Sequence, residues 1–391
     1  MDETLTPFVH PDAELSAELA VFARRIRTFA NNKLSPFARQ VDEEVMFRVE
    51  MVQDLAQEGV LGGPVANEFG GEAWTPMQIV VANEEVGAVC GNARGFMAVQ
   101  SGLVAQCLER FGDQEQKTAW LPRLISGETI GCFGLTETEA GSDVASLQCR
   151  ATPTDAGYQI SGEKIWITNG GIADIALVFA TVDPEFGGKG ITCFLIEMNT
   201  PGVRRSPMEG KELGHRGSNH AQLIFDKAAV EASAVVGGIG NGFKVAMGGL
   251  TCGRLSVAAG AVGIHRAALL ASIEFVNQRQ QFGKPIAAFQ MVQERIADMT
   301  VSLMAARQLV YRCARARAAG SEAPGDLAAA KLFATEAASQ AADTAIQLHG
   351  GRGYSTAYPV ERLLRDSIGL RIYEGTSMIQ KTILSRAVLR P

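Results

Sequence analysis

Apolar residues recur at helical spacing along the first third of the chain, from residue 13 to about residue 127. One run repeats at intervals of three or four residues, which places its members on one helix face: Leu15, Leu19, Phe22, Ile26 and Phe29. Two further helices are predicted over Met77–Val89 and Phe96–Phe111. We expect the first helix to stop at Ser35–Pro36, and the glycines between 59 and 71 indicate a long loop.

The pattern changes between residues 128 and 240. Short runs rich in Ile, Val, Thr and Phe alternate with Gly, Pro, Asn and Asp, as is typical of strands and turns. The predicted strands are Thr129–Thr136, Tyr158–Thr168, Ile175–Val182, Ile191–Glu197 and Gln222–Phe225. Asn169–Gly170 is a hairpin turn signal between the second and third of these runs. The zone is therefore predicted to be an antiparallel sheet domain.

Long, alanine-rich helices return after residue 240. The predicted spans are 241–279, 288–320, 324–349 and 376–388. Pro324 is a favoured first-turn residue, and Gly350–Gly351 ends the same helix. We expect the arginines of the second span to form a solvated helix face; they are Arg307, Arg312, Arg315 and Arg317. An order of helices, sheet and helices argues against both an all-helix bundle and a doubly wound sheet.

Length and charge limit the functional classes. The 391 residues suggest two or three domains. With 36 Lys and Arg against 42 Asp and Glu, the net charge of -6 argues against a nucleic-acid binder. No uninterrupted apolar run reaches about 18 residues, so no membrane span is predicted. The acidic start is unlike a signal peptide, and the 7 cysteines form no C-x-x-C pair. We expect a cytoplasmic protein with buried, reduced thiols.

Common cofactor and metal patterns are missing from the sequence. It contains no Walker motif, and no strand leads into a G-x-G-x-x-G loop. His215 and His220 lie five residues apart without further ligands, so we expect no metal site. His349 precedes a glycine pair and is interpreted as a helix-end residue.

Two segments of the sheet zone could contact a flat, polar ligand. Cys132–Glu137 ends in a turn that continues through Ala140–Asp143, where backbone N–H groups and hydroxyls could bind a ring edge or a phosphate. A simple turn at the edge of the sheet is the alternative. Strand alternation places Trp166 and Thr168 on one face, which suits a heteroaromatic ligand or, equally, a core tryptophan.

The first long helix of the last zone carries a charge on an apolar face. Phe243, Met247, Leu250 and Arg254 share that face, and the apolar members should be buried. A buried arginine needs a carboxylate or an anionic ligand, unless its head reaches the rim. Arg279 at the far end of this helix could complement the helix dipole or meet a phosphate.

Glu374 lies just before the predicted cap of the last helix, Thr376 or Ser377. Burial would raise the pKa of its carboxyl, whereas the helix N-terminus would lower it. The residue could therefore be a general base or a glutamate that stabilises the helix start.

Taken in order, these segments resemble the acyl-CoA dehydrogenase family from about residue 15 to residue 387. The motifs are Cys132–Glu137, Ala140–Asp143, Trp166–Asn169, Gln280–Gly283, Gln347–Gly351 and Tyr373–Ser377. The resemblance implies an N-terminal helical domain (1–127), a middle antiparallel β-domain (128–240) and a C-terminal domain of the four-helix-bundle type (241–391). It also implies FAD, a homotetramer or homodimer, and electron-transfer flavoprotein as the electron acceptor.

The resemblance assigns site residues one by one. The FAD contacts are Phe133, Leu135, Thr136, Gly141, Ser142, Trp166, Ile167, Thr168, Arg279, Gln281, Phe282, Phe289, Gln290, Gln347, Leu348, Gly350, Gly351, Thr376 and Met378. Among these, Arg279, Gln281 and Phe282 resemble a segment that reaches the FAD of a neighbouring subunit. The substrate contacts are Arg94, Ser142, Phe243, Leu250, Arg254, Tyr373 and Gly375.

The reaction that the resemblance implies is α,β-dehydrogenation of an acyl thioester. Glu374 resembles the base that removes the α-proton, while the β-hydride passes to flavin N5. Some members carry the base just before the helix arginine, where this chain has Gly253. Thr251 stands where many members have Asp near the thioester arm, so either coenzyme A or a carrier protein could deliver the substrate.

The substrate expectation depends on Arg94. The stretch around it resembles glutaryl-CoA dehydrogenases, in which the matching arginine binds a distal carboxylate, although Gly87 and Gly95 replace the Glu and Ser of that subfamily. A surface arginine paired with Glu84 or Glu85 is the structural alternative. A carrier-bound polar thioester of secondary metabolism, or a flavin oxidase or monooxygenase on this fold, are the functional alternatives.

Overall fold

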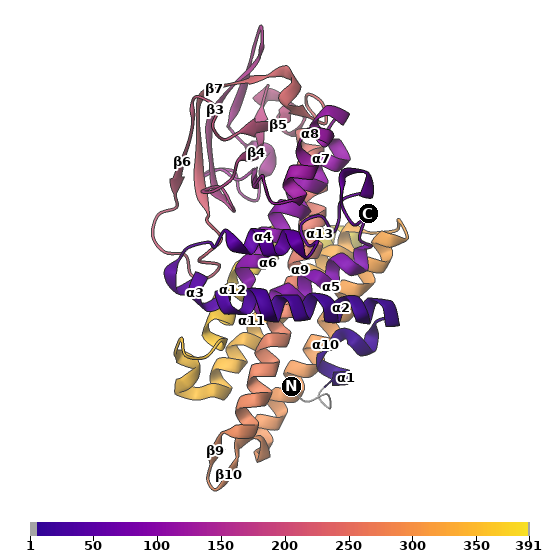
Figure 1. Ribbon diagram of the computed structural model, residues 1–391, viewed down its shortest axis with the longest axis vertical. Coiled ribbons are helices and arrows are strands. Elements are labelled where there is room, and N and C mark those ends of the chain that lie inside the picture. Colours follow the sequence, from indigo (N-terminus) through magenta and orange to yellow (C-terminus); the bar gives the residue numbers. More distant parts are fainter. Residues whose placement is uncertain (1–5, 390–391) are drawn as a thin grey trace.

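The computed structural model describes residues 6–389. A mixed β-sheet occupies one end of the molecule and long helices run to the other end, with the N-terminal helices packed across the junction (Figure 1). The N-terminal helices are α1 (Thr6–Val9), α2 (Ala17–Phe29), α3 (Ser35–Glu44), α4 (Glu50–Gln57), α5 (Pro76–Val89), α6 (Gly91–Met97), α7 (Gln106–Phe111) and α8 (Gln114–Ile125). The side chains of Ser16, Thr75 and Asp113 cap α2, α5 and α8.

Two π-helical segments join helices that the apolar pattern of the sequence predicted as separate or as shorter. Ala30–Leu34 connects α2 to α3 without a break, so the predicted stop at Ser35–Pro36 is wrong. Pro36 lies at the start of α3, directly after this π-helical segment, and the chain remains helical through it. Ala98–Ala105 similarly joins α6 to α7, and the predicted helix over 96–111 begins earlier, at Gly91.

The sheet has eight strands in the order β6-β7-β3-β2-β4-β5-β8, with β1 beside β4. Their bounds are β1 (Gly131–Gly134), β2 (Arg150–Thr154), β3 (Gly157–Ile167), β4 (Ile175–Thr181), β5 (Ile191–Glu197), β6 (Val203–Pro207), β7 (Ala221–Glu231) and β8 (Val235–Val236). β4 pairs in parallel with both β1 and β2, whereas the other pairings of this sheet are antiparallel, as predicted.

Asn169–Gly170 does not close a hairpin. β2 lies between β3 and β4, and the turn that starts at Asn169 carries the chain past it. The Asn169 side chain donates to the backbone oxygen of Gly131, at 3.2 Å, and so ties this turn to β1. The dipeptide signals a turn, but which strands pair depends on contacts distant in sequence.

The C-terminal region is built around α9. The helices are α9 (Gly242–Gln278), α10 (Gln290–Ala318), α11 (Pro324–His349), α12 (Val360–Leu370) and α13 (Ser377–Val388), and a small ribbon, β9 (Gln280–Gln281) with β10 (Lys284–Pro285), extends from α9. α9 packs against α5, α10, α11 and α12. It is long and apolar enough to cross a membrane by composition, yet 78% of its most apolar window is buried inside the protein. α12 was not predicted.

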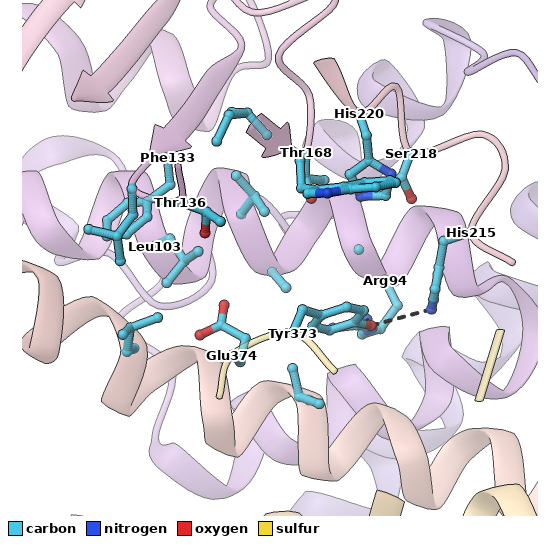
Figure 2. Close-up of a pocket in the computed structure, with 18 residues that line it drawn as sticks. Arg94, Leu103, Phe133, Thr136, Thr168, His215, Ser218, His220, Tyr373 and Glu374 are labelled. Carbon is cyan, nitrogen blue, oxygen red and sulfur yellow. Dashed lines mark hydrogen bonds between the residues drawn. The ribbon is translucent and has the colours of Figure 1, made fainter. Parts of the chain in front are cut away.

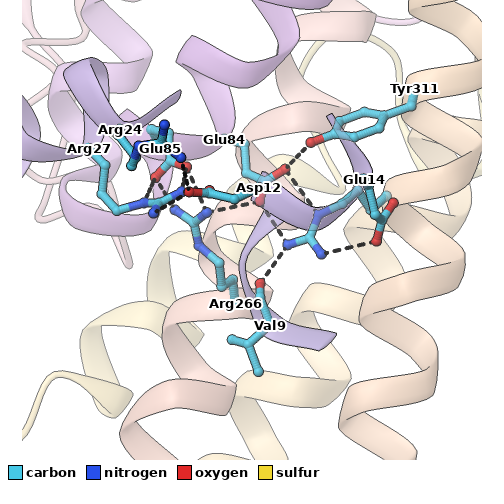
Figure 3. Close-up of polar contacts among 10 residues, drawn as sticks. Val9, Asp12, Glu14, Arg24, Arg27, Glu84, Glu85, Arg266 and Tyr311 are labelled. Carbon is cyan, nitrogen blue, oxygen red and sulfur yellow. Dashed lines mark hydrogen bonds and ion pairs between the residues drawn. The ribbon is translucent and has the colours of Figure 1, made fainter. Parts of the chain in front are cut away.

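A buried network of charges joins the N-terminal helices to α9 and α10 (Figure 3). Glu84 and Glu85 on α5 are almost completely buried. Arg266 of α9 lies 3.1 Å from Glu84, and Arg27 of α2 lies 2.8 Å from Glu85. Arg307 of α10 is fully buried at 2.9 Å from Glu84, so its prediction as part of a solvated face is wrong. Helix pairing in the core has taken it out of solvent.

The cysteines are all free, as the sequence predicts. Six are buried, and Cys252 is partly buried. Burial raises the pKa of the Cys132 thiol to about 12. Such thiols stay protonated at neutral pH and are unreactive.

Candidate functional site

One cavity of about 130 Å³ lies where the N-terminal helices, the sheet and the C-terminal helices meet (Figure 2). It is lined by Arg94, Gly95, Ala98, Val99, Leu103, Phe133, Leu135, Thr136, Trp166, Ile167, Thr168, His215, Ser218, His220, Leu250, Val257, Tyr373 and Glu374. Leu103 and Phe133 lie toward one side of the cavity, whereas Arg94 and His215 lie toward the other. The cavity thus has an apolar end and a polar, basic end.

The end of β3 supplies three consecutive residues to this cavity. A register shift between Lys164 and Ile167 interrupts the strand alternation, and Trp166 has a positive φ of 58°. As a result, Trp166, Ile167 and Thr168 all line the cavity, which the predicted alternation did not allow. Trp166 is 51% exposed, so the alternative of a core tryptophan is wrong.

Glu374 projects its carboxylate into the cavity from the loop before α13. Its φ is 57° and that of Gly375 is 89°, so two successive residues adopt left-handed conformations. Thr376 caps α13 by accepting from the backbone N–H of Ile379 at 3.3 Å. Within residues 6–389, Oε2 of Glu374 is buried and has no hydrogen-bond partner. Such an oxygen is available to a ligand.

A glycine on α9 makes room for this carboxylate. A Cβ atom at Gly253 would lie 2.5 Å from the carboxyl carbon and from both carboxyl oxygens of Glu374. Any side chain at position 253 would therefore displace the acid.

Burial raises the pKa of Glu374 to about 7, although Arg254, Lys331 and Arg94 each act to lower it. The decrease in this pKa that was expected from the N-terminus of the last helix is smaller than the increase caused by burial. Near neutral pH the carboxylate can therefore accept a proton and release it again, as a general base requires.

Arg254 approaches the same loop through the backbone. Its Nε donates to the carbonyl oxygen of Glu374 at 3.3 Å, and its side chain is only partly buried. The apolar stripe beside it is also only partly buried: Phe243 is 37% exposed, and Leu250 lines the cavity. The expectation of a fully buried stripe is wrong: Met247 and Leu250 pack against the core only in part, and Leu250 borders the cavity.

The basic end of the cavity is organised by a chain of polar contacts. Arg94 is 2% exposed and donates to the hydroxyl of Tyr373. Tyr373 Oη lies 3.3 Å from His215 Nε2, and the backbone N–H of His215 donates to Asp366 at 2.7 Å. Glu84 and Glu85 contact other arginines, and Arg94 is buried, so the structural alternative of a surface Arg94 paired with either of them is wrong.

Burial decides the charge at this end of the cavity. It lowers the pKa of His215 and raises the pKa of Tyr373 to about 12. Both side chains are therefore neutral at pH 7. Among the residues that the structure describes, no carboxylate lies within ion-pair distance of Arg94. A buried cation of this kind favours an anionic ligand.

Ten of the predicted site residues meet in this cavity. They are Arg94, Phe133, Leu135, Thr136, Trp166, Ile167, Thr168, Leu250, Tyr373 and Glu374. Others lie around it without lining it: Phe243, Arg254, Gly375, Thr376 and the exposed Met378. Gly141 and Ser142 lie in an exposed turn after β1.

The remaining predicted cofactor residues lie at the opposite end of α9. They are Arg279, Gln281, Phe282, Phe289, Gln290, Gln347, Leu348, Gly350 and Gly351. At about 1.5 Å per residue, the helix separates Arg279 from Leu250 by about 40 Å. The β9–β10 ribbon marks this distant end in Figure 1, and Phe282 on it is 92% exposed. These residues do not line the same cavity within one chain.

Several residues of the site were not identified from the sequence. His215, Ser218 and His220 line the cavity, although the histidines were considered only as metal ligands. Their loop follows β6 at a distance in sequence from every motif, and no local pattern marks it. His349 is the buried last residue of α11 and stacks on Phe275 at 4.3 Å, as its interpretation as a helix-end residue allows.

The N-terminal helical region, the sheet region and the C-terminal helical region each match a known family model. The family models described as Acyl-CoA dehydrogenase, N-terminal domain, middle domain and C-terminal domain match residues 16–128, 132–228 and 240–389. An acyl-CoA dehydrogenase of Bacillus subtilis (strain 168) is 38% identical over 375 residues, which cover 96% of this chain and 99% of the relative.

Two solved structures have a closely similar fold. Butyryl-CoA dehydrogenase from Megasphaera elsdenii superposes with a TM-score of 0.93 at 36% identity, covering 96% of this chain and 99% of the other. A glutaryl-coenzyme A dehydrogenase in complex with glutaryl-CoA also gives a TM-score of 0.93 at 36% identity, covering 96% of each chain.

Proposed function

The chain belongs to the acyl-CoA dehydrogenase family, and from this premise we propose that Glu374 is the base in the α,β-dehydrogenation of a short acyl-CoA with an anionic distal group. The enzymes of this family are FAD-dependent oxidoreductases that act on CH–CH bonds. The observation that carries the proposal is the carboxylate of Glu374, which faces the cavity and has a buried oxygen without a hydrogen-bond partner among residues 6–389.

The cavity wall fits a flat, partly polar ring system. Phe133, Leu135 and Ile167 provide apolar contacts, while the hydroxyls of Thr136 and Thr168 can bond to polar ring edges. The exposed indole of Trp166 borders the same space. These residues would hold the isoalloxazine of FAD, which supplies an acceptor for the hydride from the β-carbon.

In the proposed reaction, Glu374 removes a proton from the carbon next to the thioester carbonyl. Among the described residues that line the cavity, Glu374 is the one carboxylate, and Gly253 leaves it the space that it needs. Its backbone N–H stabilises the negative charge that develops on the thioester oxygen, as donors do in an oxyanion hole. The apolar residues around the acid limit access of water to the carbanion.

The proposed substrate class rests on Arg94. Its guanidinium lines the cavity, is 2% exposed, and lies beside the neutral side chains of Tyr373 and His215. A carboxylate at the far end of a short acyl chain would neutralise that charge. Electron-transfer flavoprotein as the acceptor and a homotetrameric assembly are part of the same proposal.

Anaerobic reduction of the FAD-loaded protein tests this function directly. Absorbance of the flavin is followed after addition of butyryl-CoA, isovaleryl-CoA or glutaryl-CoA. We expect bleaching, fastest with glutaryl-CoA, and a loss of at least about a thousandfold in Glu374→Gln with FAD still bound. Near-full activity of Glu374→Gln would refute the assignment of the base. Oxygen consumption without any thioester would instead favour an oxidase or monooxygenase.

A further inference from the structure

The backbone carbonyls of the Glu374 loop are held by side chains from three different helices. Arg254 of α9 donates to the oxygen of Glu374 at 3.3 Å. Gln380 of α13 donates to the oxygen of Gly375 at 2.9 Å and to that of Glu374 at 3.4 Å. Lys331 of α11 donates to the oxygen of Gly375 at 2.8 Å. Two successive left-handed residues thus turn their carbonyls toward a common set of donors, which we call the loop clasp.

Lys331 is a charged member of the loop clasp that the reaction described so far does not use. Its side chain is fully buried, and among the described residues no carboxylate lies within ion-pair distance. Glu336, five residues along α11, already contacts Arg371 at 2.9 Å and Ser377 at 2.6 Å. A buried ammonium is costly unless an anion offsets its charge. The acid of the cavity, Glu374, is available for that role.

Few charged side chains influence the carboxyl of Glu374 and the ammonium of Lys331. Glu374 is influenced by Arg254, Lys331 and Arg94, all cations. Burial lowers the pKa of Lys331 to about 8; Glu374 and Glu336 oppose this decrease, and Arg254 adds to it. Removing the charge of Lys331 would therefore leave Glu374 with less stabilisation of its ionised form.

The shape of the loop also depends on the clasp. Left-handed backbone conformation is unfavourable for a residue with a side chain, such as glutamate. A Cβ at Gly375 would lie 2.7 Å from Nε2 of Gln380, so the clasp closes on a position that only glycine fits. The hydrogen bonds from Lys331 and Gln380 offset the conformational cost and keep the carboxylate directed into the cavity.

We infer that Lys331 is a positioning residue for the proposed base: it holds the left-handed loop through the Gly375 carbonyl, and its charge favours the ionised form of Glu374. This inference rests on the proposed function, because it assumes that Glu374 removes the α-proton. It predicts two separable effects, one on the rate of proton removal and one on the pH at which removal begins.

Exchange of the α-protons of butyryl-CoA and glutaryl-CoA with D₂O, measured by mass spectrometry from pH 5.5 to pH 9, separates these effects. The FAD-loaded wild type is compared with Lys331→Met, which lacks both charge and hydrogen bond, and Lys331→Gln, which keeps a donor. Lys381→Met, on an exposed position of α13, is the matched control. Flavin absorbance and thermal unfolding report whether each variant is intact.

We expect Lys331→Met to exchange at least about tenfold more slowly at pH 7 and to shift the acid limb upward by about one pH unit. Lys331→Gln should recover part of the rate but keep the shifted limb. If Lys331→Met does not fold, Lys331→Gln provides the test. An acid limb of exchange at the same pH as in the wild type would then refute the role of the charge. The inference is overturned if Lys331→Met is intact and its exchange rate at pH 7 and the acid limb of its pH profile both equal those of the wild type. Absence of exchange in the wild type refutes the proposed base itself.

Discussion

At Glu374 burial and nearby positive charge act in opposite directions on one carboxyl. Burial raises its pKa to about 7 even though three cations lie near it. A carboxyl with an ordinary pKa would be ionised in both free enzyme and complex near neutral pH, with little driving force for proton transfer. The fold thus converts a common acidic residue into one suited to act as a base near pH 7.

The pH dependence of activity follows from this value. Because the base acts in its ionised form, kcat/KM should rise with pH through about pH 7 and level off above it. Stopped-flow reduction of the flavin by a thioester from pH 5.5 to pH 9 measures this limb. A limb near pH 4.5 would contradict burial as the determinant.

Arg94 determines substrate choice in the proposal. Arg94→Gln should slow flavin reduction by glutaryl-CoA by about 10- to 100-fold while changing that by butyryl-CoA far less, because only the former has a carboxylate to pair with the guanidinium. Since Arg94 also holds Tyr373, Tyr373→Phe is the control that removes this contact and keeps the charge. Equal losses on both thioesters in Arg94→Gln would argue against a carboxylate site.

At the scale of elements, irregularities position the site. Residues of the π-helical segment Ala98–Ala105 line the apolar part of the cavity, and the register shift near Trp166 presents three consecutive residues at the end of β3, Trp166 to Thr168, to it. Both features break the regular period from which a helix or strand is predicted. π-helical turns are often found at functional sites, and this one lines the same cavity as the proposed base.

The buried charge network should contribute strongly to stability. Burial raises the pKa of the Glu85 carboxyl, but Arg266 and Arg27 outweigh it and hold that pKa below its ordinary value. Arg266→Met would leave Glu84 and Glu85 with too little compensating charge and should lower the free energy of unfolding by about 3–5 kcal/mol at pH 7. Chemical denaturation measures this loss.

The same network predicts how that loss varies with pH. A carboxyl with a depressed pKa stabilises the fold above its unfolded pKa, and this contribution disappears as pH falls through the folded pKa. The difference in the free energy of unfolding between the wild type and Arg266→Met should therefore become smaller toward acidic pH. Arg312→Met, at a site with a 65% exposed side chain, is the control and should change stability by less than about 1 kcal/mol. An equal loss in both variants would contradict the network argument.

For the whole molecule, the predicted cofactor residues lie at both ends of α9. One group lines the cavity, and the other, with Arg279, lies about 40 Å away along the helix. Two copies arranged so that the distant end of one reaches the cavity of the other would unite both groups. The exposed Phe282 and Tyr354, at 92% and 90%, lie in the segments that such an assembly would cover.

Arg279→Ala should therefore reduce FAD retention and assembly together. Light scattering coupled to gel filtration and the flavin-to-protein ratio measure the two properties. Arg39→Ala, whose side chain is 60% exposed on α3, is the control. A variant that keeps full flavin content and normal assembly would contradict the intersubunit role.

Local patterns were sufficient for much of the fold. The spans predicted for α5, α9, α10, α11 and α13 agree with the structure to within two residues at each end, because their apolar periodicity and their terminal Pro, Gly and Thr residues act locally. The loops and short polar strands β2 and β6 lack such signals. Strand pairing was wrong at Asn169–Gly170, because pairing depends on contacts between segments far apart in sequence.

By itself, the sequence determined the family, the order of the three regions and the residue types of the site, since these are recorded in ordered motifs and short-range periodicity. Tertiary structure alone decided that Arg307 is buried, that Arg94 contacts Tyr373 and not Glu84, and that His215 and Lys331 lie beside the site. The physical reason is that burial and charge pairing depend on which distant segments pack together. The pKa of Glu374 depends on the same packing, and so does its proposed use as a base.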